Sequence, residues 1–413
     1  MAHDILISKH NEVYAKVFAE RYILKELSEF FTFYVPGHQF TPAFKNKIWD
    51  GKIRLLNTQT QCIYLGLLSY VEEFCQERGY IIEYDKTRPD IQDEFSTYHA
   101  EKFAQSLNLT SLGKPITAKE HQIKALVTSM QNRRTLLLSP TASGKSLIIY
   151  LLIRQFLDYQ GLKGLIVVPT TSLVEQLYSD FADYSEGNGF SVQKNVQKIY
   201  QGMSKEAECP VVISTWQSIF KLPEEYFHQF DFIIGDEAHL FKATSLVHIL
   251  TSCINTKYRI GLTGTLDGTK THKLVLEGLF GPVKQVITTK ELIDKKILSD
   301  FQIKCLILKH SQEKCEESRD WSYQEELDYL VNSGNRNRFI RNLTISLNKN
   351  TLVLFQMVEK HGKKLYEMIK ERAGDRKVFF IHGSVDTEDR EEVRHIMEKE
   401  NDAIVVASYG TFS

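Results

Sequence analysis

The stretch Ser139-Pro-Thr-Ala-Ser-Gly-Lys-Ser146 decides the fold, because it follows an apolar run at 135–138 and opens a helical run at 146–156. A strand, a turn that presents backbone N–H groups and a helix N-terminus, in this order, form a phosphate-binding loop, or P-loop. We expect Lys145 to reach the β- and γ-phosphates of a nucleotide and the Ser146 hydroxyl to ligate Mg²⁺. Ser139 stands where the P-loop pattern usually has its first glycine. The residues predicted to surround the nucleotide are Pro140, Thr141, Ala142, Ser143, Gly144, Lys145 and Ser146.

A second stretch, Asp231-Phe-Ile-Ile-Gly-Asp-Glu-Ala-His239, carries an apolar strand straight into two adjacent carboxylates. In phosphoryl-transfer sites an acid at the end of a strand holds Mg²⁺, and the next carboxylate can orient and deprotonate the attacking water. We therefore assign Asp236 to the metal and Glu237 to the base. An exposed Asp-Glu pair alone is usually solvated charge, but this pair shares an α/β domain with the P-loop and completes a nucleotide site.

Short β-branched runs alternate with longer helical stretches from about residue 135 onward, which predicts an α/β fold. The runs are too apolar for one face of the sheet to be exposed to solvent, so we expect parallel sheets covered by helices on both sides. The first five strands form one doubly wound domain, and the last four begin another. The polar stretch 311–320 is expected to be a flexible excursion. The predicted strands are 135–138, 165–168, 211–214, 232–235, 260–263, 303–308, 351–355, 377–381 and 403–407.

Residues 1 to about 110 show no regular strand-helix alternation and predict a separate small α+β domain. Within it, Phe44-Lys-Asn-Lys-Ile-Trp-Asp-Gly-Lys-Ile-Arg54 mixes basic and aromatic side chains. This mix is expected where phosphates are neutralised and bases or sugars stack. Trp49-Asp-Gly could equally be a tight hairpin turn with its Trp buried, and a hairpin could also present the lysines. The candidate contacts are Lys45, Lys47, Trp49, Lys52 and Arg54.

Composition excludes several classes of protein. Hydrophobic residues at 42% and charged residues at 25% match an average soluble protein. The six cysteines form no CxxC pair and the thirteen histidines no HExxH, so neither a zinc site nor a disulfide framework is predicted. No apolar run approaches the roughly 20 residues of a membrane span, so we expect no membrane partner and a cytoplasmic location. The net charge of −1 gives no global attraction to polyanions, and nucleic acid would need local basic patches.

At this point the chain resembles superfamily-2 helicases of the DEAH/DExH kind, because a series of their motifs follows in order. Gln122 looks like the adenine-reading glutamine of that family, with His121 where the family usually has Tyr. The further matches are 168–176 to motif Ia, 214–218 to the next strand-contacting motif, 236–239 to motif II, 262–265 to motif III and 352–356 to motif IV.

The resemblance implies ATP and Mg²⁺ as cofactors and a role for each motif. Thr263 and Thr265 would couple the γ-phosphate state to movement of the lobes, and His239 would bridge the two motifs. The Thr-Thr and Ser-Thr pairs at the strand-to-helix turns could hold backbone phosphates, or could simply cap helices. The residues implied to contact nucleic acid in the motor are Pro169, Thr170, Thr171, Thr215, Trp216, Gln217, Phe355 and Gln356.

The segment 44–56, together with Thr-Ala-Ser in the P-loop, is similar to the UvsW-type recombination helicases of T4-like phages. This resemblance implies two tandem RecA-like lobes, the second incomplete, after a small α+β domain: 1–110, 111–298 and 299–413. It also implies a monomeric ATP-dependent helicase or translocase that acts on branched, single-stranded or forked DNA, or on RNA-DNA hybrids, in phage recombination, repair and replication, in the host cytoplasm.

One departure concerns the end of the chain, which stops inside what looks like motif V. The family's motif VI, a glutamine-arginine segment, does not occur in the sequence. An arginine finger can be worth roughly 10³ to 10⁵ in rate, so we expect a truncated chain that binds ATP but hydrolyses it poorly. Two other hypotheses are a duplex DNA translocase of the restriction-enzyme type and a nucleic-acid-binding protein with an impaired ATPase.

Overall fold

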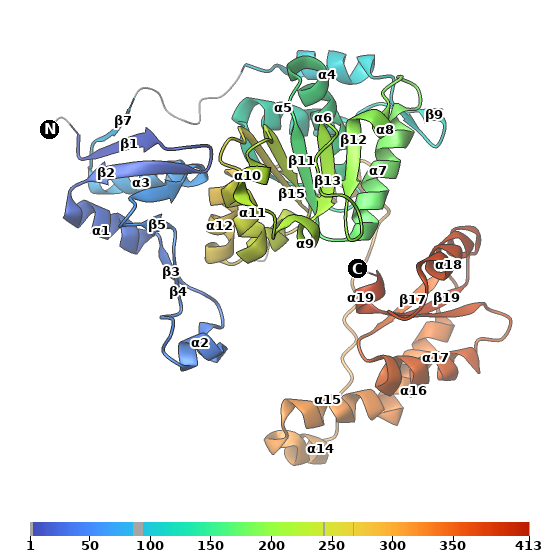
Figure 1. Cartoon of the computed structure of the whole chain (residues 1–413). Helices are drawn as coiled ribbons and strands as arrows, with labels where there is room; N and C mark the ends of the chain where they lie inside the picture. The colour runs from blue at the N-terminus through green and yellow to red at the C-terminus, as the bar shows by residue number, and fades with distance from the viewer. Residues whose placement is uncertain (1–2, 86–93, 243, 267, 413) are drawn as a thin grey trace. The chain divides into compact units, whose positions relative to one another are not determined.

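The computed structural model describes residues 3–85, 94–242, 244–266 and 268–412 (Figure 1). They form two compact units, Met1–Asp300 and Phe301–Ser413. The first unit holds a five-stranded sheet and a seven-stranded sheet, and the second holds a three-stranded sheet. None of the described helices combines the length and the hydropathy that crossing a bilayer requires.

The five-stranded sheet at the N-terminus has the order β5-β6-β2-β1-β7. Ile5, Ile7, Ala15 and Val17 alternate along the central strands and point into one core, as the two-residue period of a strand requires. β1 and β7 run parallel, and the other pairs are antiparallel. The elements are β1 (Ile5–Lys9), β2 (Tyr14–Ala19), α1 (Arg21–Phe30), β5 (Leu56–Asn57), β6 (Cys62–Tyr64), η2 (Leu65–Leu67), α3 (Leu68–Arg78) and β7 (Ile82–Tyr84).

A two-stranded ribbon leaves this sheet between α1 and β5, and we call residues 32–54 the finger. β3 (Thr32–Tyr34) pairs antiparallel with β4 (Lys52–Arg54). Between them lie η1 (His38–Phe40) and the short helix α2 (Pro42–Lys45). Figure 1 shows α2 at the far end of the ribbon, away from the five-stranded sheet.

The seven-stranded sheet is entirely parallel, with the order β12-β13-β11-β14-β15-β10-β16. The five predicted strands are confirmed, with ends that move by at most two residues. Two further strands at the edges were missed, because they are short and carry lysine and glutamine. The strands are β10 (Arg134–Leu138), β11 (Gly164–Val168), β12 (Val196–Ile199), β13 (Val211–Thr215), β14 (Phe232–Gly235), β15 (Tyr258–Thr263) and β16 (Val283–Gln285).

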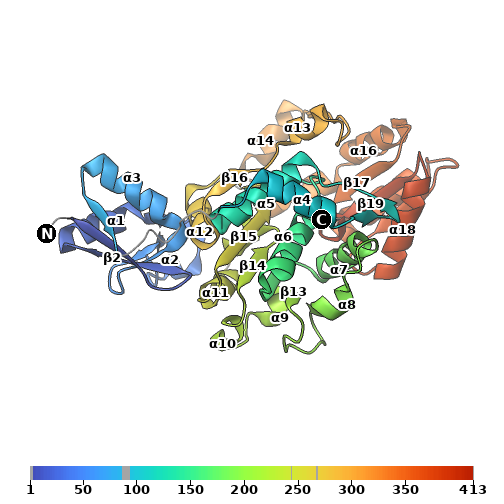
Figure 2. The same cartoon turned by 90° about the horizontal axis from the view of Figure 1, so that it is seen from above.

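Helices cover both faces of this sheet (Figures 1 and 2). Neighbouring residues such as Leu136 and Leu137 therefore belong to different cores, which explains why the strands are apolar throughout. One face packs against α4 (Thr97–Ser106), α5 (Glu120–Asn132), α6 (Lys145–Gln160), α7 (Thr171–Ser185) and α13 (Thr289–Asp294). The other packs against α9 (Trp216–Ile219), α10 (Glu224–Phe227), η3 (Ala238–Lys242), α11 (Thr244–Ser252) and α12 (Lys270–Phe280). The remaining elements are β8 (Thr110–Ser111), β9 (Lys114–Pro115) and α8 (Val192–Asn195).

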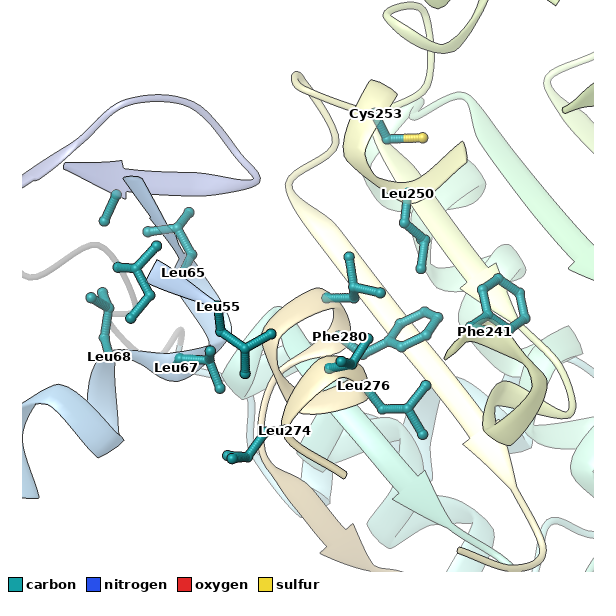
Figure 3. Close-up of a cluster of buried hydrophobic side chains, with 14 of the residues drawn as sticks. Leu55, Leu65, Leu67, Leu68, Phe241, Leu250, Cys253, Leu274, Leu276 and Phe280 are labelled. Atoms are coloured by element: carbon teal, nitrogen blue, oxygen red, sulfur yellow. The ribbon is translucent and has the colours of Figure 1, made fainter. Parts of the chain in front are cut away.

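The two sheets of the first unit share one hydrophobic core. Leu65 and Leu67 of η2 and Leu274 and Leu276 of α12 belong to the same buried cluster, and Figure 3 shows both groups of side chains. A Cβ on Gly66 would collide with the carbonyl oxygen of Glu277, so the backbones approach as closely as a glycine allows. The five-stranded sheet is therefore packed firmly against α12. The predicted boundary near residue 110 stays a prediction.

Polar contacts reinforce this packing. The Tyr70 hydroxyl donates to Glu277 Oε2 at 2.6 Å, and Arg134 Nη2 donates to Glu12 Oε2 at 2.6 Å. The Glu12 backbone N–H donates to the carbonyl of Ile254 at 2.9 Å. The first two bonds have a carboxylate acceptor, and charge-assisted hydrogen bonds of this kind are stronger than neutral ones.

The second unit contains the parallel sheet β17-β19-β18, so three of its four predicted strands are confirmed. The predicted strand 303–308 is wrong: this segment is irregular, and Ile303 and Ile307 are 81% and 82% exposed. β propensity yields a strand only where a neighbouring strand offers a ladder, and the described residues offer none there. The elements are β17 (Thr351–Phe355), β18 (Val378–Ile381), β19 (Ile404–Ser408), α16 (Gly334–Ser346), η5 (Val358–Gly362), α17 (Lys363–Lys370), α18 (Thr387–Lys399) and α19 (Tyr409–Phe412).

The polar stretch 311–320 is also not the flexible excursion that was predicted. It forms α14 (Gln312–Glu317) and a 3-10 turn, η4 (Ser318–Asp320). Ser311 caps the helix by accepting a hydrogen bond from the Lys314 N–H at 3.3 Å. The next helix, α15 (Tyr323–Asn332), begins with a capping box formed by Ser322 and Glu325.

Candidate functional site

The P-loop connects β10 to α6 at the carboxyl edge of the seven-stranded sheet. Ala142 and Gly144 adopt left-handed backbone angles of 64° and 79°, and a Cβ at Gly144 would collide with the Gln122 side chain. The loop is closed by a 2.7 Å hydrogen bond between the hydroxyls of Ser139 and Ser143, both buried. Ser139 does not have a positive φ, so its backbone does not require the glycine that usually stands at this place.

Lys145 and the two carboxylates after β14 meet at this edge. Lys145 Nζ lies 2.6 Å from Glu237 Oε1. Glu237 has a φ of 50°, a sparsely populated conformation that turns the chain sharply as the strand ends. Asp236, only 6% exposed, lies beside them. The structure thus brings together three residues that the sequence assigned to phosphate, metal and base.

Asp236 fits the role of a metal ligand. Burial raises the pKa of its carboxyl, the Glu237 carboxylate raises that pKa further, and Lys145 opposes the shift. Within the described part of the chain, its Oδ1 is buried and finds no hydrogen-bond partner. A buried carboxylate oxygen without a partner is costly unless a ligand completes it. Mg²⁺ commonly takes one or two protein carboxylates together with substrate phosphates, which matches this donor set.

Ser146 makes a contact that the sequence did not suggest. Its hydroxyl lies 2.9 Å from the Tyr184 hydroxyl on α7, and it also hydrogen-bonds Asp180 one turn earlier. Burial raises the pKa of Asp180, while that hydrogen bond from Ser146 opposes the shift. No local pattern marks Tyr184 or Asp180, because only the packing of α7 on α6 places them beside the P-loop.

Gln122 and His121 hold the P-loop from the start of α5. Gln122 Nε2 donates to the Ser143 carbonyl at 3.2 Å, and His121 Nε2 lies 2.7 Å from the same oxygen. The Gln122 Oε1 accepts from the Lys119 N–H at 2.8 Å, and its side chain is 4% exposed. Both ends of the amide are thus bound to protein, and its role in reading adenine stays a prediction.

His239 links the acidic pair to the strand β15. Its Nδ1 lies 3.0 Å from Thr263 Oγ1 and 3.4 Å from Glu237 Oε2. Thr263 Oγ1 in turn donates to the carbonyl of Thr265 at 2.9 Å. A continuous polar chain therefore runs from Lys145 through Glu237 and His239 to the stretch that resembles motif III.

Six nucleic-acid candidates of the first unit lie at the ends of two neighbouring strands, β11 and β13. Thr170 caps α7 by accepting from the Leu173 N–H at 3.3 Å, and Thr171 is exposed. Gln217 Nε2 donates to the Pro169 carbonyl at 3.4 Å, which ties the two turns together. Thr215 is buried at the N-cap of α9, but its hydroxyl bonds that of Ser218 at 2.9 Å and makes no capping hydrogen bond to a backbone N–H. Trp216 is half-buried and packs edge-on against Phe220.

In the second unit, Gln356 is exposed at the end of β17, but Phe355 is 2% exposed inside the core. A Cβ on Gly362 would collide with the Phe355 ring. This burial excludes direct contact between Phe355 and nucleic acid in this conformation and corrects the prediction. Successive side chains of a strand point to opposite faces of the sheet, so the neighbours Phe355 and Gln356 point in opposite directions.

The finger carries the five remaining candidates. Lys45 and Lys47 are exposed, whereas Lys52 Nζ lies 4.9 Å above the Tyr34 ring and Arg54 forms an ion pair with Asp50. Trp49 is half-buried, and its Nε1 donates to the Lys52 carbonyl at 2.9 Å. Trp49-Asp-Gly leads into β4, but the strand that pairs with β4 is β3, and η1 and α2 lie between them. The stretch is therefore not the tight hairpin turn of the alternative prediction.

Comparisons with known proteins agree with this architecture. The family described as the N-terminal domain of the DNA helicase UvsW matches residues 4–85, and the family described as the res subunit of type III restriction enzymes matches residues 100–268. The ATP-dependent DNA helicase uvsW of Enterobacteria phage T4 is 34% identical over 420 residues, which cover 99% of this chain and 81% of that protein.

Two solved structures of the T4 protein are also similar. The crystal structure of T4 UvsW has a TM-score of 0.64 and 33% identity, and covers 99% of this chain and 81% of that one. The crystal structure of the UvsW helicase from bacteriophage T4 has a TM-score of 0.63 and 34% identity, with 68% and 99% covered. With its small N-terminal domain ahead of parallel-sheet α/β lobes, the chain belongs to the UvsW family of superfamily-2 helicases.

Proposed function

We propose that this chain is an ATP-dependent DNA helicase that remodels branched DNA or RNA-DNA hybrids during phage recombination, repair and replication. The observation that carries the proposal is the meeting of Lys145, Asp236 and Glu237 at one edge of the sheet, beside the P-loop. The T4 relative is itself described as an ATP-dependent DNA helicase, which supports the same reaction here.

Each residue of the site has a distinct proposed task. Lys145 binds the β- and γ-phosphates, while Asp236 and Ser146 hold Mg²⁺. The metal, when bound, neutralises charge on the phosphates. Without nucleotide, Glu237 is engaged by Lys145. Phosphates compete for that ammonium, so nucleotide binding releases the Glu237 carboxylate to orient and deprotonate water. The Glu237 carboxylate is therefore free to act as a base only when a nucleotide is bound.

Movement would be coupled to hydrolysis through His239. It contacts both Glu237 and Thr263, so a change at the base alters the hydrogen bonds of the 263–265 turn. Nucleic acid would bind at the turns after β11 and β13 through Thr170, Thr171 and Gln217, and on the finger through Lys45 and Lys47. We propose a monomer that works in the cytoplasm of the host cell.

The test measures ATP turnover with and without forked DNA, together with strand displacement from the same fork. We expect slow turnover that DNA stimulates and displacement that requires ATP, with Lys145→Ala as the negative control. Binding of DNA without stimulated turnover would instead favour a nucleic-acid-binding protein with an impaired ATPase.

A duplex translocase is the second candidate, because residues 100–268 match the type III restriction family. A translocase of that kind would displace the third strand of a triplex from an intact duplex, yet leave a fork unseparated. The helicase proposal fails if triplex displacement occurs and fork unwinding does not.

A further inference from the structure

The finger contains a pocket that the proposed reaction leaves unexplained. It is an open pocket of about 850 Å³ at the tip, lined by the apolar side chains of Phe44, Ile48 and Trp49, by Lys45 and Lys47, and by Gln39 and Asp50. Ile48 is 79% exposed, an unusual position for a large aliphatic side chain beside two lysines. An exposed apolar surface rimmed by polar groups usually marks an interaction site.

The walls of the pocket are held in place by the rest of the finger. The Tyr34 and His38 rings stack at 4.8 Å, and the Phe44 ring meets His38 edge-on at 4.8 Å. Gly51, with a φ of 78°, lets the chain pass where any Cβ would collide with His38. The Trp49 indole is fixed by its hydrogen bond to the Lys52 carbonyl. A ligand would therefore meet preformed rings and lose little affinity to ordering them.

Charge selects the class of ligand. The finger, residues 32–54, has four basic side chains and one acidic side chain, a net charge of +3 in a chain whose net charge is −1. The acidic one, Asp50, is neutralised by Arg54. Among the described residues, Lys45 and Lys47 form no ion pair, and Lys47 adopts a left-handed φ of 54° that a lysine seldom takes. Flat rings flanked by unpaired cations match a base with its flanking phosphates.

We infer that this pocket binds an unpaired nucleobase of single-stranded DNA, which stacks against Trp49 and Phe44 while Lys45 and Lys47 neutralise the neighbouring phosphates. The inference rests on the proposed function, which makes DNA the substrate. It adds that the finger distinguishes an open strand from a duplex. Bases in a duplex already stack on their neighbours, so only a single strand or a branch point offers a free base face.

The experiment uses the full chain without nucleotide and compares two DNAs of equal duplex length, one blunt and one with unpaired arms. Fluorescence anisotropy gives both dissociation constants. Trp49→Ala should weaken binding to the forked DNA about tenfold and leave the blunt duplex nearly unchanged, since stacking on one aromatic ring is commonly worth a factor of this order. Ile48→Ala should act in the same direction. Leu112→Ala is the matched control, because Leu112 is an equally isolated aliphatic residue, 89% exposed, far from the finger in sequence.

Trp49→Phe separates stacking from folding, because phenylalanine keeps a ring but loses the hydrogen bond to Lys52. Near-normal binding by this variant, with loss in Trp49→Ala, supports the inference. Equal losses on both DNAs, or no loss in Trp49→Ala and Ile48→Ala, would overturn it and leave only phosphate contacts. ATP turnover and unwinding are measured on the same variants, so failure of the helicase proposal appears as absent turnover in the wild type, whatever the binding preference.

Discussion

The Ser146 hydroxyl lies 2.9 Å from the Tyr184 hydroxyl, so the proposed Mg²⁺ ligand is already engaged by the helix that follows β11. With Tyr184 as the donor, this hydrogen bond occupies a lone pair of Ser146 Oγ that Mg²⁺ would otherwise use. A hydrogen bond of this kind is worth about 1 kcal/mol. Tyr184→Phe keeps the ring and removes the competitor, and we expect Mg²⁺-dependent nucleotide affinity to rise about fivefold, measured by calorimetry. Tyr178→Phe, on the same helix but under Lys198, is the control. Unchanged or weaker affinity in Tyr184→Phe would show that the contact does not compete with the metal.

The three residues of the nucleotide site should separate binding from turnover. Lys145→Ala should abolish ATP-dependent activity without unfolding, because the side chain contributes charge rather than core packing. Asp236→Asn should lose Mg²⁺-dependent binding. Glu237→Gln should keep binding and lose turnover by about 10²- to 10⁴-fold. Calorimetry and phosphate release measure the two properties, and the reverse pattern for Asp236 and Glu237 would exchange their roles.

The basic residues of the finger should set the salt dependence of DNA binding. Changing Lys45, Lys47, Lys52 and Arg54 to Ala should weaken binding to branched DNA roughly uniformly across sequences. Each phosphate contact contributes about 0.9 to the slope of log affinity against log salt. Because Arg54 is paired with Asp50 and Lys52 lies over Tyr34, Lys45→Ala with Lys47→Ala should account for most of the change, about 1.8.

Lys205→Ala, an exposed lysine outside the finger, serves as the control for that slope. Nucleotide affinity should be the same in all of these variants, since the finger does not reach the P-loop. An unaltered slope in the fourfold variant would mean that the finger is structural and that the turns after β11 and β13 alone hold DNA.

Gly66 should be essential to the packing of the two sheets in the first unit. Gly66→Ala places a methyl group against the Glu277 carbonyl, and overpacking of this kind costs about 1–3 kcal/mol. Urea unfolding should show that loss in the free energy of unfolding. Gly383→Ala, where a Cβ would meet open space, should leave stability unchanged. Equal stability of the two variants would mean that η2 and α12 can separate freely.

The second unit should lose stability in mild acid because of His361. Burial, with the Arg336 guanidinium and the Lys364 ammonium nearby, lowers the pKa of His361 to about 4, from an ordinary value of 6.5. As the pH drops from 6.5 toward 4, His361 is protonated in the unfolded chain but not in the folded chain. The free energy of unfolding of the second unit therefore falls over this pH range. His361→Gln should flatten this dependence in unfolding experiments at several pH values, whereas His10→Gln, at an exposed site, should not. A wild-type profile that stays flat between these pH values would contradict this pKa.

The sequence by itself determined eight of the ten strands of the two parallel sheets and the motifs at their ends, but not the short edge strands β12 and β16. A parallel strand buried on both faces must be apolar at every position, so 135–138 and 232–235 stand out without knowledge of their partners. The P-loop and the Asp236-Glu237 pair are equally local, because each is a strand, a turn and the residues that immediately follow. These features need no long-range contact to be recognised.

Tertiary structure alone decided the contacts that join residues far apart in the chain. Tyr184 reaches Ser146 because α7 packs on α6, and Gly66 meets Glu277 because η2 packs on α12. The apolar segment 303–308 shows the converse, since its β propensity found no neighbouring strand. Hydrophobic patterning specifies which face of an element is buried, but not which element covers it, because apolar burial is non-directional and many partners satisfy it equally.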